Sequence, residues 1–148
     1  MIALGCDHGG FELLQEVKAH LDKLGFQYKD FGTYSTESVD YPDYAAKVAR
    51  AVQSGECDRG IIICGTGIGV SIVANKFKGI RAALCGDCFS AEATRQHNDA
   101  NILTMGARVT GSGLACKIVD TFLETGFDGS YHADRVALIS DIERRERA

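Results

Sequence analysis

The sequence predicts an α/β fold: a three-layer α/β/α sandwich on a five-stranded parallel Rossmann-like sheet, with an extra C-terminal helix. Short apolar segments alternate with amphipathic segments five times, and about 10 to 15 helical residues separate most strands. The chain has 148 residues, 45% of them hydrophobic, and its one proline is Pro42. We therefore expect a single ordered domain over residues 1–148, without a flexible linker.

The first half of the chain contains two pairs of a strand and a helix. Residues 2–6 are a short apolar run typical of a strand, and residues 11–24 carry leucine and valine at helical spacing until Gly25. Residues 26–31 bring aromatic side chains close to alternation, which predicts a second strand. A polar loop then leads to a helix at 43–54, where apolar side chains recur along one face.

The second half continues the alternation and adds one helix. The β-branched residues 61–63 predict a buried strand, and Ser90 is the expected N-cap of a later helix. A sheet already covered by four helices leaves little apolar surface for the last helix, so we expect it to pack on a second subunit. The other elements are expected as helices at 70–77, 90–97, 114–125 and 134–147, and strands at 80–85 and 102–105.

Composition excludes several classes of function. The formal net charge of −4 gives no general attraction to nucleic acid, and no apolar run approaches the roughly 18 residues of a membrane span. The first residues lack the basic region and apolar core of a signal peptide. Six cysteines are scattered through apolar segments, so we expect most of them to be reduced core thiols in a cytoplasmic protein.

A cysteine in a glycine-rich loop is the strongest functional signal. Residues 61–63 lead into Cys64, and Gly65, Gly67 and Gly69 follow before a helix begins. Backbone N–H groups and a helix dipole at such a loop favour anion binding or a reactive thiolate. The loop lacks the lysine of a P-loop, the spacing of a dinucleotide fingerprint and the arginine of a cysteine phosphatase. A buried structural cysteine in a tight turn is the alternative interpretation.

The motif Cys85-Gly-Asp-Cys88 offers a second thiol chemistry. A C-x-x-C sequence before a helix is typical of a redox site. No second C-x-x-C or paired histidine motif supplies further zinc ligands. Pro42 precedes the motif, whereas thioredoxin-like folds carry their proline after it.

Other candidates follow from the sheet, because ligands of parallel sheets bind at the carboxyl ends of the strands. Asp7 and His8 follow the first strand and Arg108 follows the fifth, while His97 and Asn98 are expected in a loop at the same edge. A histidine there could be a general acid or base, and an arginine could hold a phosphate. Helix capping, a solvent-facing histidine and surface ion pairs are the structural alternatives.

Taken together, these motifs resemble the sugar-phosphate isomerase family of type B ribose-5-phosphate isomerases. The resemblance extends over nearly the whole chain, in order. It rests on Gly5-Cys-Asp-His-Gly-Gly-Phe11, Asp40-Tyr-Pro42, Cys64-Gly-Thr-Gly-Ile-Gly-Val-Ser71, Asn75-Lys-Phe77, Arg95-Gln-His-Asn-Asp-Ala-Asn101 and Gly106-Ala-Arg108.

The resemblance implies an aldose–ketose isomerase that works through an enediolate, with ribose 5-phosphate and ribulose 5-phosphate as its sugars. It assigns Cys64 as the base, Thr66 as its assistant and His97, with Asp7 nearby, as the ring-opening residue. The substrate-binding positions that it implies are Asp7, His8, Tyr41, Asn98, Arg108, Arg135 and the loop residues Gly65, Gly67, Ile68, Gly69, Val70 and Ser71. The resemblance implies that the backbone N–H groups of residues 67–71 stabilise the enediolate oxygen.

The resemblance also implies no metal or organic cofactor, and a homodimer with a shared active site, with pairing into tetramers left open. Tyr131 stands where the family often carries a first phosphate-binding arginine, four residues before Arg135. Allose 6-phosphate or a related hexose phosphate is the alternative substrate. Outside this class, the alternatives are a thiol redox protein using Cys85 and Cys88 and a non-catalytic phosphate-ligand binding module.

Overall fold

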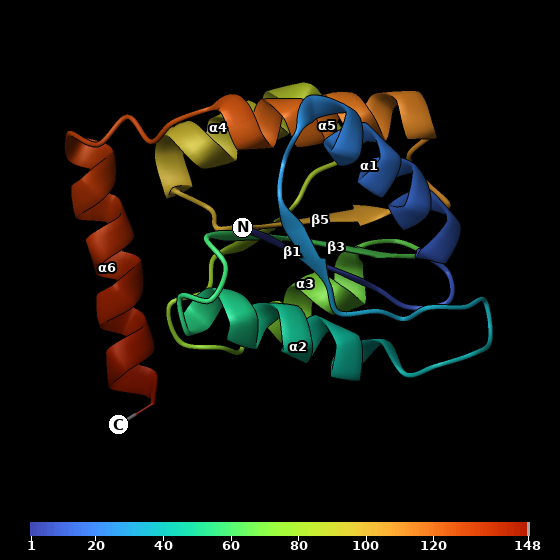
Figure 1. Ribbon diagram of the computed structural model, residues 1–148. Coiled ribbons are helices and arrows are strands. Elements are labelled where there is room, and N and C mark those ends of the chain that lie inside the picture. The colour runs from blue at the N-terminus through green and yellow to red at the C-terminus, as the bar shows by residue number, and fades with distance from the viewer. Residues whose placement is uncertain (148) are drawn as a thin grey trace.

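The computed structural model describes residues 1–147 and contains a parallel sheet between two helical layers (Figure 1). The strands run in the order β2-β1-β3-β5-β4, and every neighbouring pair is parallel. They are β1 (Ile2–Cys6), β2 (Tyr28–Asp30), β3 (Arg59–Cys64), β4 (Ala82–Leu84) and β5 (Ile102–Gly106). The predicted sandwich with a five-stranded parallel sheet is therefore confirmed.

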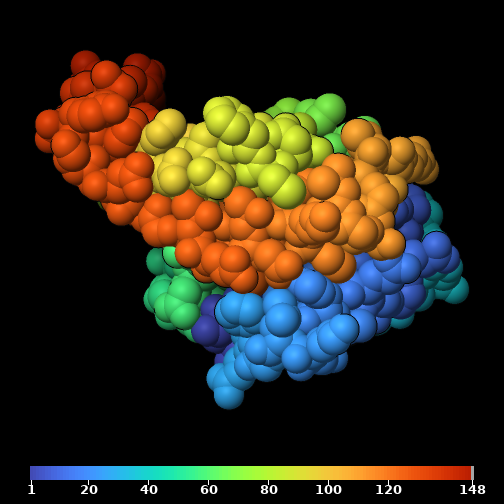
Figure 2. Space-filling view, turned by 90° about the horizontal axis from the view of Figure 1, so that it is seen from above, coloured from blue at the N-terminus to red at the C-terminus, as the bar shows by residue number. Residues whose placement is uncertain are grey.

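The helices divide between the two faces of the sheet. Figure 1 shows α1, α4 and α5 over one face and α2 and α3 over the other, and Figure 2 looks onto the face formed by α1, α4 and α5. Their bounds are α1 (Phe11–Leu24), α2 (Tyr41–Gln53), α3 (Ile68–Ala74), α4 (Cys88–Asn98), α5 (Ser112–Glu124) and α6 (Tyr131–Glu146).

The central strand β3 divides the core into two parts. Successive side chains of a strand point to opposite faces. Ile61 and Ile63 accordingly join the cluster formed with α1 and α5, whereas Ile62 and Cys64 join the cluster formed with α2 and α3. The three isoleucines are fully buried, and burial of each such side chain contributes about 1.5–3 kcal/mol. This burial fixes the strand whose end carries Cys64.

Several element boundaries differ from the predicted ones. The edge strands β2 and β4 have three residues each, shorter than the expected 26–31 and 80–85, because their ladders extend only along part of one neighbour. The prediction that Ser90 is the N-cap of α4 was wrong. Asp87 caps α4, and its Oδ1 accepts the Ser90 N–H at 2.7 Å while its Oδ2 accepts the Ser90 hydroxyl at 3.0 Å.

Helix α6 stands away from the sandwich and packs mainly against α4 (Figure 1). It begins at Tyr131, three residues before the expected start at 134. None of its described residues is buried, and Leu138, Ile139 and Ile142 are 60%, 47% and 53% exposed. The apolar side chains of the last helix therefore remain uncovered in a single chain.

Candidate active site

Cys64 lies at the carboxyl end of β3, opposite Gly106 of β5. Its side chain is 6% exposed, and its Sγ accepts a hydrogen bond from the Gly67 N–H at 3.1 Å. Gly67 has φ +80°, and a Cβ there would lie 2.7 Å from the Met105 carbonyl carbon. The Thr104 hydroxyl donates to the Gly67 carbonyl at 2.9 Å. The turn is thus fixed with one backbone donor directed at the sulfur.

Thr66 and Gly69 bring further groups to the same loop. The exposed Thr66 accepts the Ile68 N–H on its Oγ1 at 3.2 Å. Gly106 allows this arrangement, because a Cβ at that position would come within 2.6 Å of the Thr66 backbone. The Tyr41 ring lies against Gly69, where a Cβ would be 2.5 Å from a ring carbon. Both glycines therefore permit close approaches that define the loop.

The N–H groups of residues 67–71 do not all point to a ligand, which corrects the sequence expectation. Gly67 donates to the Cys64 sulfur and Ile68 donates to Thr66, so these two donors are used inside the loop. The N–H groups in the first turn of a helix have no carbonyl partner within the helix, because their acceptors would lie four residues earlier in the chain. The donors of Gly69, Val70 and Ser71 therefore remain the candidates for binding an oxyanion at the start of α3.

Asp7 and His8 lie in the loop that follows β1. Asp7 is 9% exposed, and its Oδ1 accepts the N–H groups of Gly9 and Gly10 at 2.9 and 3.1 Å. Its carboxylate therefore holds the turn that leads into α1, but it does not cap the helix, because the N-cap of α1 is Gly10, which has no side chain to form a capping hydrogen bond. The His8 Nδ1 accepts the Val39 N–H at 3.1 Å, which leaves the proton of a neutral ring on Nε2.

Arg108 follows β5 and crosses above the cysteine loop. Its N–H donates to the Gly65 carbonyl at 3.0 Å, and the Ala107 N–H donates to the Cys64 carbonyl at 2.8 Å. The guanidinium extends along Gly65, where a Cβ would lie 3.6 Å from the Arg108 Nε. Across residues 1–147, no acidic side chain forms an ion pair with this arginine, so its positive charge is available to an anion.

His97 and Asn98 lie at the opposite edge of the sheet, so the expectation that they share the edge of Cys64 was wrong. They end α4 and precede β5, whereas Cys64 ends β3, and these two strands are parallel. A strand of five residues spans about 16 Å, which separates His97 from Cys64 within one chain. The buried Arg95 anchors this edge by donating to the Asp99 carboxylate at 2.8 Å and to the Ala100 carbonyl at 2.7 Å.

Arg135 also lies away from the cysteine loop, in the first turns of α6. Its guanidinium lies over the Tyr131 ring, 4.7 Å from the ring centroid. The chain therefore carries two groups of predicted site residues. One surrounds Cys64, and the other lies where α4 meets α6.

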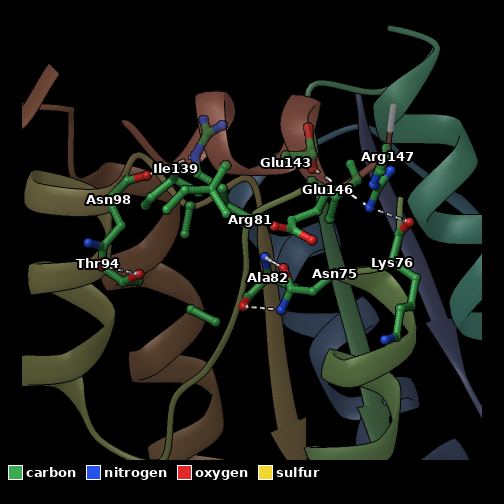
Figure 3. Close-up of a pocket in the computed structure, with 14 residues that line it drawn as sticks. Asn75, Lys76, Arg81, Ala82, Thr94, Asn98, Ile139, Glu143, Glu146 and Arg147 are labelled. Carbon is green, nitrogen blue, oxygen red and sulfur yellow. Dashed lines mark hydrogen bonds and ion pairs between the residues drawn. The ribbon is translucent and has the colours of Figure 1, made fainter. Parts of the chain in front are cut away.

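A cavity of about 660 Å³ lies beside the second group, between α6 and the amino end of β4 (Figure 3). Asn98, Ile139 and Ile142 are among its lining residues. Arg147 donates to the Lys76 carbonyl at 2.6 Å and lies 3.8 Å from the Glu143 carboxylate. The Arg147 guanidinium of this cavity is thus already paired, and exposed isoleucines lie beside it, which suits a protein surface better than a sugar phosphate.

Two supporting residues were not foreseen. Thr104 anchors Gly67 through its hydroxyl, and the Val39 N–H orients His8. A lone threonine inside the apolar strand β5 was a usable signal for the first. No local pattern could have shown the second, because 31 positions separate Val39 from His8.

Comparisons with known proteins agree on one kind of protein. A sequence model of the family described as Ribose/Galactose Isomerase matches residues 2–139. The chain is 54% identical over 144 residues to ribose-5-phosphate isomerase B of Escherichia coli (strain K12), with 97% of each chain covered. It is 46% identical over 127 residues to 4-deoxy-4-sulfo-D-erythrose isomerase of Clostridium sp., covering 85% of this chain and 80% of the relative.

A solved structure of ribose-5-phosphate isomerase B from Clostridium thermocellum superposes with a TM-score of 0.97. The two sequences are 56% identical, and the alignment covers 98% of each chain. The fold and the order of the motifs along the chain thus match those of experimentally solved relatives.

Cys85 should be a poor redox thiol. Burial, and then the Asp87 carboxylate, raise the pKa of Cys85 to about 11, so little thiolate forms near neutral pH. We predict that Cys85 resists iodoacetamide in the folded protein and reacts after denaturation, as measured by peptide mass spectrometry. We also predict no disulfide with Cys88 in a titration with thiol–disulfide buffers. A readily formed disulfide between these residues would favour the redox interpretation.

Proposed function

Because the chain belongs to the ribose/galactose isomerase family and is an aldose–ketose isomerase, we propose that it interconverts D-ribose 5-phosphate and D-ribulose 5-phosphate. This activity would place it in the pentose phosphate pathway of the cytoplasm. Among residues 1–147, no helix is long and apolar enough to cross a membrane. The observation that carries the proposal is the Cys64 sulfur in a glycine loop beside Asp7, His8 and Arg108.

Isomerisation requires a base that moves a proton between C2 and C1 of the sugar. Cys64 is that base in our proposal. The Gly67 N–H directed at its sulfur stabilises negative charge there, and the fixed turn holds the sulfur in place. The exposed Thr66 hydroxyl assists by transferring a proton at the sugar hydroxyl.

The enediolate formed by this step carries negative charge on its oxygens, and donors fixed in advance stabilise such charge. The N–H groups of Gly69, Val70 and Ser71 supply these donors at the start of α3. Tyr41 and Gly65 border the same space and contact the sugar. No metal or organic cofactor is needed, because hydrogen bonds and the thiol supply each required group.

The phosphate of the substrate binds at the edge that carries Arg108 and His8. Arg108 provides a guanidinium that forms no ion pair among residues 1–147, and His8 can donate through Nε2. In this proposal Arg135 of the second subunit also binds the phosphate. His97 and Asn98 of that subunit reach the sugar. His97 protonates or deprotonates the sugar ring to open it, because pentose phosphates exist largely as closed furanoses.

A homodimer brings the two groups of residues into one site. Ile68, Leu84 and Val109 are 51%, 44% and 72% exposed and line an apolar cavity of about 290 Å³ beside the cysteine loop. The apolar side chains of α6 are also exposed. Association that buries both surfaces would place the partner subunit's His97 near Cys64. Further pairing into tetramers is compatible with this arrangement.

Other aldoses with an anionic end are the alternative substrates. Allose 6-phosphate is one, and the relative from Clostridium sp. acts by its name on a sulfonated four-carbon aldose. Tyr131 bears on the choice of substrate. It supplies an aromatic ring against Arg135, whereas an arginine at position 131 would supply a second positive charge for the phosphate.

Replacing Cys64 with alanine tests the assigned base. We predict that C64A loses about 10²–10⁴-fold or more in turnover, the usual contribution of a general base, while calorimetry still detects sugar-phosphate binding. The measurement is NMR in deuterium oxide, which follows exchange of the C2 proton of ribose 5-phosphate. The matched control C88A should keep full activity.

Retained exchange in C64A would contradict the role of this thiol. Binding of ribose 5-phosphate by the wild-type protein without any exchange would instead support a non-catalytic binding module.

Replacing His97 with asparagine separates ring opening from proton transfer. Ribulose 5-phosphate is acyclic because its C5 hydroxyl is phosphorylated, so exchange of its C1 proton needs no ring opening. We predict that H97N slows conversion of ribose 5-phosphate at least about tenfold more than this exchange, measured by NMR. Equal losses in the two reactions would remove the ring-opening role.

A further inference from the structure

His97, Asp128 and His132 form a cluster of ligating side chains outside the cysteine loop. The three residues come from the last turn of α4, the loop before α6 and the first turn of α6. One candidate ligand atom from each lies within 4.8 Å of the other two. The imidazoles are stacked, with centroids 4.3 Å apart and ring planes at 13°. We propose that this cluster binds one divalent transition-metal ion such as Zn²⁺, Ni²⁺ or Co²⁺.

The backbone already holds these residues together. The Asp128 N–H donates to the Gln96 carbonyl at 3.1 Å, which ties the loop to the end of α4. The His132 N–H donates to the Gly129 carbonyl at 3.0 Å. Bonds of about 2.0–2.2 Å in a tetrahedral site place ligand atoms about 3.3–3.5 Å apart. Rotation of the two rings out of their stack and a shift of about 1 Å would close the site.

The donor set selects the class of metal. Two imidazoles and one carboxylate suit Zn²⁺, Co²⁺ and Ni²⁺, whereas Mg²⁺ and Ca²⁺ prefer oxygen ligands. The Asp128 carboxylate offsets part of the ionic charge. Within residues 1–147, none of the three side chains makes a hydrogen bond or ion pair with another residue, so the metal displaces no such interaction. A fourth position remains for water.

Metal binding has a consequence for catalysis that rests on the proposed function. A metal on the His97 imidazole occupies the lone pair that ring opening requires. The bound ion therefore inhibits conversion of the cyclic aldose. It should affect proton exchange in the acyclic ribulose 5-phosphate much less, because that exchange depends on Cys64.

Titration with Ni²⁺, followed by calorimetry, tests the site directly. We expect one ion per chain in the wild-type protein. D128N and H132N should each bind Ni²⁺ about tenfold or more weakly, because loss of even an outer partner of a metal ligand costs about 10–100-fold. The control H20N should bind like wild type, since the His20–Asp120 pair, at 2.6 Å, belongs to no three-ligand cluster among residues 1–147.

Co²⁺ spectra and activity assays complete the test. Co²⁺ bound at the cluster should give ligand-field bands without intense thiolate charge-transfer absorption. Inhibition of D128N should need about tenfold or more Ni²⁺ than inhibition of the wild-type enzyme. Absence of binding, binding unchanged in D128N and H132N, or a thiolate spectrum would overturn the metal site. Binding at the cluster without inhibition would overturn its link to ring opening. Failure of the proposed function would show separately, as no isomerisation before metal is added.

Discussion

The parallel pairing of β3 with β1 and β5 is the constraint on which the site depends. It places Cys6 opposite Ile63 and Cys64 opposite Gly106. The residues that follow β1, β3 and β5 therefore meet at one edge of the sheet, which brings Asp7, the cysteine loop and Arg108 together. Because the strands are parallel, the residues that precede them lie at the other edge of the sheet. His97 precedes β5 and therefore lies there.

This separation of the two groups gives the proposed dimer a chemical reason as well as a packing reason. One chain presents Cys64, the N–H groups at the start of α3 and Arg108 at the carboxyl edge of its sheet, the groups to which we assign the base, the oxyanion donors and phosphate binding. The same chain presents His97 at the end of α4 and Arg135 on α6, a helix without buried residues. Each group lacks what the other supplies, and exposed apolar side chains border both. Association that covers these side chains would complete two sites at once.

The fold was predictable because the apolar strands and amphipathic helices alternate so regularly. The cysteine loop was also predictable, since its residues are contiguous and follow a buried strand. The prediction that His97 lies at the same sheet edge as Cys64 was wrong, although the sequence already placed His97 before a predicted strand. Asp87 rather than Ser90 caps α4, and residue type alone could not separate the two, because aspartate and serine are both preferred N-caps. The cluster of His97 and His132 could not be foreseen, because 35 positions separate two residues that stack only in the folded chain.

The most direct test of a site shared between subunits is activity in mixed dimers. The variants C64A and H97N can be co-expressed with different tags, and dimers that contain one chain of each can be isolated. If Cys64 works with His97 of the partner subunit, each mixed dimer keeps one intact site and recovers about half of the wild-type activity, although both homodimers are impaired. Mixed dimers that are no more active than the two parent variants would contradict a shared site.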